Sequence, residues 1–149
     1  LYQRGNYPKF VTFETNGTKP LKPVLVDWFN DHNDIEVLFS VSPKLQTVSG
    51  ELPKKAWKPG NFLQYSKLVK NSKTQVKFVV YENDKSKSEL LERTNEIKNE
   101  DVMFYVMPLG ARTEQQEAIN PGFYDWLIAN GFNISMRVHV FAYGNQVGT

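Results

Sequence analysis

Polar or conformationally unusual residues follow four hydrophobic, strand-like runs of this chain, each at the point where the run ends. In parallel α/β proteins the carboxyl ends of the strands meet at one edge of the sheet, and binding sites are built there. We therefore predict that these four segments line one pocket. They are 14–18 (Glu-Thr-Asn-Gly-Thr), 40–44 (Ser-Val-Ser-Pro-Lys), 107–110 (Met-Pro-Leu-Gly) and 135–139 (Ser-Met-Arg-Val-His).

The first two segments offer polar groups that suit a small ligand. Segment 14–18 combines a carboxylate, two hydroxyls and an amide with Gly17, which lets a ligand approach the backbone. In segment 40–44, Ser42 supplies a hydroxyl, Pro43 fixes the turn and Lys44 supplies an ammonium, a set suited to a carboxylate or a pair of hydroxyls. The alternatives are an ordinary Asn-Gly turn with threonine caps, and a strand edge followed by a solvent-facing lysine.

The other two segments offer different chemistry. Met107–Gly110 has little reactive side-chain chemistry, but its backbone and apolar surface could support a flat ring, unless it is only a turn after a strand. Arg137 and His139 alternate in the expected last strand, so they would point to the same face. Such a pair suits an anionic substrate, and the alternative for His139 is a structural hydrogen bond.

Composition limits the possible functions. A chain of 149 residues fits one domain, residues 1–149, and a domain of that size buries roughly 70% of its unfolded surface. The net charge of +2 is too small to indicate nucleic-acid binding, and no apolar run is long enough to span a membrane. The absence of cysteine excludes disulfides, thiolate nucleophiles and cysteine-bound metals within these residues. No catalytic triad spacing, phosphate loop or histidine metal pair is present, so the residues indicate a binding pocket without an evident catalyst.

The hydrophobic pattern alternates between strands and helices. Segment 43–60, which contains three prolines, is predicted to be a loop. The expected helix caps are Asn61 and either Ser86 or Ser88, and Gly131 is the expected helix stop. The predicted strands are 10–14, 36–42, 76–81, 102–107 and 134–141; the predicted helices are 23–31, 61–71, 89–99 and 113–130, the last divided in two if Pro121 and Gly122 interrupt it.

Five strands separated by four crossovers of helical length predict an α/β fold with a parallel sheet and right-handed connections. Two arrangements of such a sheet are open at this point. One is an open doubly wound sheet, and the other is the later part of a partial (β/α) barrel.

The motifs at 14–18, 41–44 and 135–139 together resemble those of 7-carboxy-7-deazaguanine synthase, a radical S-adenosylmethionine (radical SAM) family of queuosine-type deazapurine biosynthesis. Their order and placement after strands match across nearly all 149 residues. The resemblance implies a partial (β/α) barrel of the radical SAM type, usually dimeric. It also implies a lyase reaction that converts 6-carboxy-tetrahydropterin to carboxy-deazaguanine with loss of ammonia.

The same resemblance suggests which residues bind each ligand. The family's Gln-Pro segment corresponds to Met107-Pro108, so the glutamine contact is lost here and backbone contacts through Leu109 and Gly110 remain. The last residues differ from the commoner ending of the family, although Thr149 is expected to close over the substrate. The expected SAM contacts are Gly17, Ser42, Pro43, Lys44, Met107, Pro108, Leu109 and Gly110; the expected substrate contacts are Thr15, Arg137, His139 and Thr149.

The family's cysteine triplet for a 4Fe-4S cluster, its Mg²⁺ ligand and its glycine-rich motif all precede the Glu-Thr-Asn-Gly-Thr strand, and none of them is in this chain. Without an iron-sulfur cluster no electron reaches the sulfonium of SAM. The chain begins with Leu1 and reaches its first strand within ten residues. We therefore expect it to be the C-terminal portion of such an enzyme, with the cluster and magnesium bound by other residues.

The expected partners follow from the same resemblance: a pterin substrate, an external reductant such as flavodoxin, and a second copy in a homodimer. No signal or transit peptide is visible, which favours the cytoplasm, and neither a membrane nor a nucleic acid is an expected direct partner. Two other functions stay open. One is a cysteine-free, non-catalytic α/β module that binds a nucleotide or pterin, and the other is a relative of glycyl-radical activases, which share an Asn-Gly turn at this strand.

Overall fold

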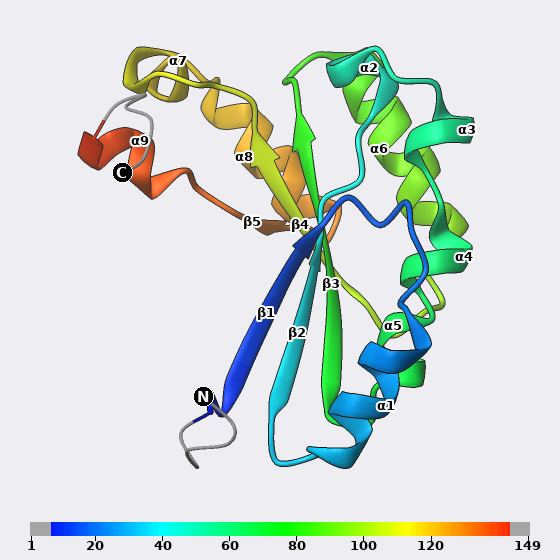
Figure 1. The fold of residues 1–149 in the computed structure, drawn as a ribbon. Helices are drawn as coiled ribbons and strands as arrows, with labels where there is room; N and C mark the ends of the chain where they lie inside the picture. Colours follow the sequence, from blue (N-terminus) through cyan, green and yellow to red (C-terminus); the bar gives the residue numbers. More distant parts are fainter. Residues whose placement is uncertain (1–6, 144–149) are drawn as a thin grey trace.

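A computed structural model describes residues 7–143, and they form a five-stranded sheet with helices between the strands (Figure 1). Each strand is parallel to its neighbours, so the predicted α/β fold is confirmed. The strands are β1 (Phe10–Thr15), β2 (Glu36–Val41), β3 (Ser72–Val80), β4 (Met103–Pro108) and β5 (Asn133–Ile134).

The order of the strands in the sheet, β1-β2-β3-β4-β5, follows their order in the chain. A doubly wound sheet has a point at which the strand order reverses, and the described strands contain no such point. Right-handed crossovers between sequential parallel strands place the connecting helices on the same face. The sheet is therefore wound in one direction, as in part of a β/α barrel, with β1 and β5 at its two edges.

Helices fill all four crossovers and also follow the last strand. Helix α1 matches its predicted range, and Pro23 lies in its first turn, where the missing N–H of proline has no helical partner to lose. The helices are α1 (Pro23–Asp31), α2 (Gln46–Ser49), α3 (Pro53–Ala56), α4 (Pro59–Phe62), α5 (Tyr65–Leu68), α6 (Asp84–Glu96), α7 (Thr113–Glu117), α8 (Pro121–Ala129) and α9 (Val138–Tyr143). Within residues 7–143, no helix combines the length and the apolar character needed to cross a membrane.

Prolines explain why segment 43–60 is partly helical, which corrects the prediction of a loop. Pro53 and Pro59 occupy the first turns of α3 and α4, where proline is well tolerated. Pro121 likewise begins α8, so the predicted helix over 113–130 is divided in two. Gly131 follows α8 with a φ of 77°, as expected for a helix stop.

Two predicted helix starts were wrong. The helix expected over 61–71 is replaced by the single turns α4 and α5, and Asn61 lies inside α4 rather than capping it. Helix α6 begins at Asp84, before either of the predicted serine caps. The side chain of Asn83 is its cap, because it accepts a hydrogen bond from the backbone N–H of Ser86 over 2.9 Å.

The last strand is much shorter than the predicted range 134–141. Only two residue pairs, Tyr105 with Asn133 and Val106 with Ile134, join β5 to β4. The chain then leaves the sheet and forms α9 from Val138. Arg137 and residue 139 therefore do not alternate along a strand, and the prediction that they share a strand face was wrong.

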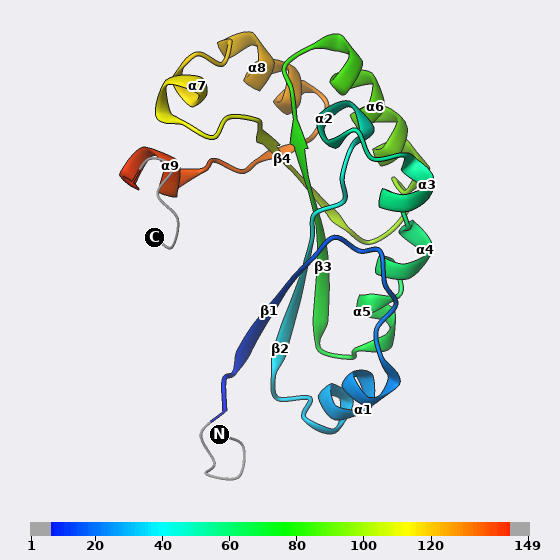
Figure 2. The same cartoon turned by 45° about the horizontal axis from the view of Figure 1, so that its top comes forward.

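The two faces of the sheet differ in character. In β3, every second side chain from Thr74 to Val80 is buried, and these residues face the helices. Figure 2 shows α1 and α3–α6 gathered on that side of β1–β3. The buried core includes Phe39, Val41, Phe62, Val76, Phe78, Val80, Leu90 and Val106.

Candidate functional site

The loop after β1 is an internally hydrogen-bonded turn. The hydroxyl of Thr15 accepts a hydrogen bond from the backbone N–H of Gly17 (3.1 Å), and the side-chain oxygen of Asn16 accepts from both the N–H and the hydroxyl of Thr18 (3.1 and 2.8 Å). Gly17 has a φ of 73° and is buried. This geometry is the Asn-Gly turn that the sequence left open as an alternative, so the polar groups of this loop are already used in part by the loop itself.

Two side chains from the second crossover hold this loop in place. The amide of Asn61 donates a hydrogen bond to the carbonyl of Thr18 (3.0 Å), and the hydroxyl of Tyr65 donates to the carbonyl of Lys19. Burial raises the pKa of Tyr65 above its ordinary value, and hydrogen bonding with Thr15 offsets the rise in part. These anchors were not predictable from the local sequence, since both residues lie more than forty positions from their partners.

The segment after β2 places Lys44 at the edge of the sheet. The backbone N–H of Ser42 donates to the carbonyl of Thr15 (2.7 Å), so this residue continues the pairing of β2 with β1. Pro43 is buried, whereas Lys44 is exposed. Lys44 forms no ion pair or side-chain hydrogen bond with any residue of the described part of the chain.

Glu89 of α6 fixes the position of this segment. Its carboxylate is buried and accepts hydrogen bonds from the backbone N–H groups of Gln46 and Thr47, each over 2.8 Å. These two N–H groups lie in the first turn of α2, where no helical carbonyl is available to them. Glu89 therefore joins α2 to α6, and through α2 it holds the Pro43–Leu45 segment.

The segment after β4 is fixed through its carbonyl groups. The carbonyl of Gly110 accepts hydrogen bonds from Nε2 of Gln116 (2.9 Å) and from Nη1 of Arg137 (3.0 Å). Nε2 of Gln116 also lies 3.3 Å from the carbonyl of Pro108, and the N–H of Leu109 donates to the carbonyl of Val80 (2.9 Å). A carbonyl oxygen has two lone pairs, so the carbonyl of Gly110 is fully used within the protein.

A pocket at the carboxyl edge brings together residues from three of the four predicted segments. Its volume is about 330 Å³. Pro43 and Lys44 come from the end of β2, Leu109 follows β4, and Arg137 follows β5. We call it the strand-end pocket; it is lined by Pro43, Lys44, Leu45, Val48, Ser49, Val79, Leu109 and Arg137.

The strand-end pocket combines apolar walls with two positive charges. Its lining residues include Lys44 and Arg137 but neither an aspartate nor a glutamate. Thr15, Gly17 and Met107 do not line this pocket, so the structure brings together only part of the predicted set. The side chain of His139 and the whole of Thr149 lie outside what the structure describes.

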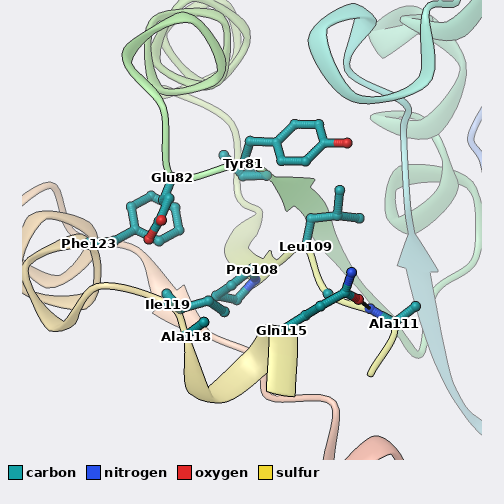
Figure 3. A pocket seen from close by; sticks show the side chains of 11 residues that line it. Tyr81, Glu82, Pro108, Leu109, Ala111, Gln115, Ala118, Ile119 and Phe123 are labelled. Carbon is teal, nitrogen blue, oxygen red and sulfur yellow. Dashed lines mark hydrogen bonds between the residues drawn. The ribbon is translucent and has the colours of Figure 1, made fainter. Parts of the chain in front are cut away.

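Leu109 also lines a second, larger pocket of about 460 Å³ (Figure 3). Tyr81 and Glu82 from the end of β3 contribute to it, and the sequence analysis missed them. Their position in the sequence could have identified them, because both residues directly follow the buried strand β3. The lining residues are Val80, Tyr81, Glu82, Pro108, Leu109, Gly110, Ala111, Gln115, Ala118, Ile119 and Phe123.

The sheet face opposite the helices carries polar groups that interact across strands. Lys77 of β3 lies 3.8 Å from the carboxylate of Glu14 on β1, and the amide of Gln75 donates to the hydroxyl of Ser40 on β2 over 3.1 Å. The Lys77 side chain is only 20% exposed, whereas that of Glu14 is 77% exposed. This face leads to the strand ends, where it presents these hydrogen-bonding groups beside apolar side chains such as Leu38, Val79 and Met107.

The described residues provide neither cysteine ligands for an iron-sulfur cluster nor a metal site built from three protein side chains. The sequence has no cysteine, and residues 7–143 contain no group of three or more His, Asp or Glu side chains that could hold a metal ion. Comparisons of the chain with protein-family models, with curated proteins and with solved structures each give no match. The resemblance to a radical SAM family therefore stays a prediction.

Proposed function

We propose that this chain forms the ligand-binding wall of a radical SAM enzyme of the 7-carboxy-7-deazaguanine synthase type, a lyase. In that proposal the strand-end pocket binds SAM, and the adjoining sheet face, which carries Lys77 and Gln75, receives the pterin substrate. The observation that carries it is the convergence of Pro43, Lys44, Leu109 and Arg137 in one pocket. All four were expected as ligand contacts, although about ninety residues separate the first from the last.

The chemistry of the pocket supports a ligand with both a flat apolar part and an anionic part. Val79 and Leu109 offer apolar surface to a ring, and Lys44 offers an ammonium that pairs with no residue of the described range 7–143. A volume of about 330 Å³ lies at the lower end of the range for small-molecule sites. In the proposed reaction SAM supplies the initiating radical, and the residues of this chain bind and orient SAM and the substrate.

The proposal requires cluster and magnesium ligands from residues outside this chain. It also includes a homodimer in the cytoplasm and an external reductant such as flavodoxin. The intact protein is therefore the appropriate material for each test. Its iron content, measured after anaerobic purification, separates a radical enzyme from a binding module that lacks a cluster.

The direct test is SAM affinity, measured by isothermal titration calorimetry on the intact protein and its Lys44→Ala variant. A hydrogen bond to a charged group contributes about 1.5–3 kcal/mol, so we expect binding to weaken roughly ten- to hundredfold. Lys55→Ala is the matched control, because Lys55 is exposed on α3 and lies outside the pocket. Unchanged affinity in Lys44→Ala would contradict the assignment of this pocket.

Turnover decides between the proposed enzyme and the non-catalytic module. Release of ammonia from 6-carboxy-tetrahydropterin, dependent on SAM and reductant, supports the synthase. SAM binding by an iron-free protein without turnover supports the binding module instead. Absence of SAM binding by the wild-type protein overturns the synthase, and absence of both nucleotide and pterin binding overturns the module.

A further inference from the structure

Arg137 has a position that neither the expected strand nor the proposed SAM contacts explain. Its half-buried guanidinium makes one hydrogen bond with the described residues, from Nη1 to the carbonyl of Gly110 (3.0 Å). Its Nε is buried and has no hydrogen-bond partner among residues 7–143. A buried donor without a partner is costly and rare in folded proteins, so this guanidinium retains unused binding capacity.

Lys44 lines the same pocket and also lacks a counter-ion in the described part of the chain. Two like charges beside apolar walls repel each other, and Leu45, Val48, Val79 and Leu109 offer no group that could neutralise them. An anion between Lys44 and Arg137 would remove this repulsion. The pocket therefore favours a ligand that carries a negative charge.

The lining favours a carboxylate over a phosphate. Phosphate sites commonly use a glycine-rich loop whose successive backbone N–H groups surround the anion. No glycine is among the lining residues of the strand-end pocket, and Pro43 has no N–H to offer. An arginine fork matches the two oxygens of a carboxylate, and a lysine adds a point charge.

We propose that Arg137 and Lys44 together bind the carboxylate of a ligand whose apolar part rests on Val79 and Leu109. This inference rests on the proposed function for the identity of the ligand, because both SAM and the carboxylated pterin carry such a group. It adds Arg137 as a residue that selects for the carboxylate. The hydrogen bond from Nη1 to Gly110 sets the orientation of the guanidinium.

The experiment compares ligands that differ only in the carboxylate, using the intact protein. Affinities for SAM and for its decarboxylated analogue are measured in the wild type and in Arg137→Ala. The wild type should prefer SAM by about tenfold or more, and Arg137→Ala should reduce that preference to within about twofold. The same comparison with 6-carboxy-tetrahydropterin and tetrahydropterin shows whether the carboxylate belongs to the substrate instead.

Controls separate carboxylate recognition from a structural effect. Gln116→Ala removes the other hydrogen bond to the carbonyl of Gly110 without changing the charge of the pocket. It should therefore weaken the binding of a carboxylated ligand and of its analogue without the carboxylate equally, and leave the preference for the carboxylated ligand intact. Arg137→Lys keeps the charge but loses the fork, and should retain part of the preference. If Arg137→Ala does not fold, Lys44→Ala provides the same comparison at the other cation.

A third probe does not depend on the proposed function. Benzoate and the neutral benzamide are titrated at millimolar concentration while the Nε signal of Arg137 is followed by nitrogen NMR. A shift with benzoate alone supports the carboxylate site, even if SAM and the pterin do not bind, in which case only the proposed function fails. The inference is overturned if no carboxylate is preferred over its neutral analogue, or if the preference survives both Arg137→Ala and Lys44→Ala.

Discussion

Replacement of Gly17 by alanine tests the packing of the loop after β1. An ideal Cβ at this position would lie 2.7 Å from Cγ1 of Val41 and 2.8 Å from Cδ1 of Phe62. Both distances are shorter than real carbon contacts allow, and both neighbours belong to the buried core. Gly17 also has a φ of 73°, a backbone conformation that favours glycine.

The magnitude follows from two separate costs. A left-handed backbone conformation costs a non-glycine residue about 1–2 kcal/mol. Forcing a methyl group into a filled core costs typically about 1–3 kcal/mol. We therefore expect Gly17→Ala to lower the free energy of unfolding by about 2–5 kcal/mol.

Gly50 provides the matched control, because it has a φ of 76° but no atom within 4 Å of an added Cβ. Gly50→Ala has the same backbone cost without the collision. Alanine also reduces the conformational freedom of the unfolded chain, and any gain in stability from that effect is common to both variants. The difference between the two variants, about 1–3 kcal/mol, is then the cost of overpacking alone.

Urea unfolding followed by circular dichroism measures both variants under one set of conditions. The midpoint should fall further for Gly17→Ala than for Gly50→Ala, with similar slopes. In thermal unfolding each kcal/mol corresponds to about 2–4 °C for a domain of this size. Equal destabilisation of the two variants would refute the packing argument, since the collision would then be absent in the folded protein.

Three further predictions concern other contacts. Glu89→Gln should lower the free energy of unfolding by about 1–3 kcal/mol in a urea titration, because one of the two capping N–H groups loses its carboxylate acceptor. Burial raises the pKa of Tyr65 in the folded protein above its value in the unfolded chain. The contribution of Tyr65 to the free energy of unfolding is therefore constant below a pH of about 10, and it is lost as the pH rises above that value. Unfolding measured at pH 9 and 11 should show a smaller loss in Tyr65→Phe than in the wild type. Glu14→Gln should change stability by less than about 1 kcal/mol in the same assay, because its contact with Lys77 is 3.8 Å long and Glu14 is largely exposed.

Local signals in the sequence were sufficient for most of the sheet. The runs that became β1 to β4 are rich in Val, Phe and Thr, residues that favour strands, and Pro23 marked the start of α1 correctly. The run at 134–141 also contains β-branched and aromatic residues, yet pairing with β4 stops after Ile134. The neighbouring strand β4 itself continues to Pro108, so the point at which this pairing ends is encoded neither by the local sequence nor by the length of β4.

The candidate site was predictable only in part for a related reason. The rule that residues at strand ends gather in one pocket predicted Lys44, Leu109 and Arg137 as neighbours, and all three line the strand-end pocket. It could not identify Glu89 or Gln116, because their function depends on which backbone groups their helices meet. Within a sequence such residues resemble ordinary polar positions of a helix.

These buried anchors explain how the strand-end pocket is formed before any ligand arrives. Glu89 fixes α2 beside Pro43 and Lys44, and Gln116 fixes the carbonyl groups on either side of Leu109. Loops ordered during folding do not lose that conformational freedom again on binding, which favours affinity. Removing an anchor should therefore weaken all ligands of the pocket alike, whereas removing a cation should weaken only anionic ligands. An equal loss of affinity for all ligands therefore identifies a residue that positions the pocket, and a selective loss of affinity for anionic ligands identifies a residue that binds the ligand.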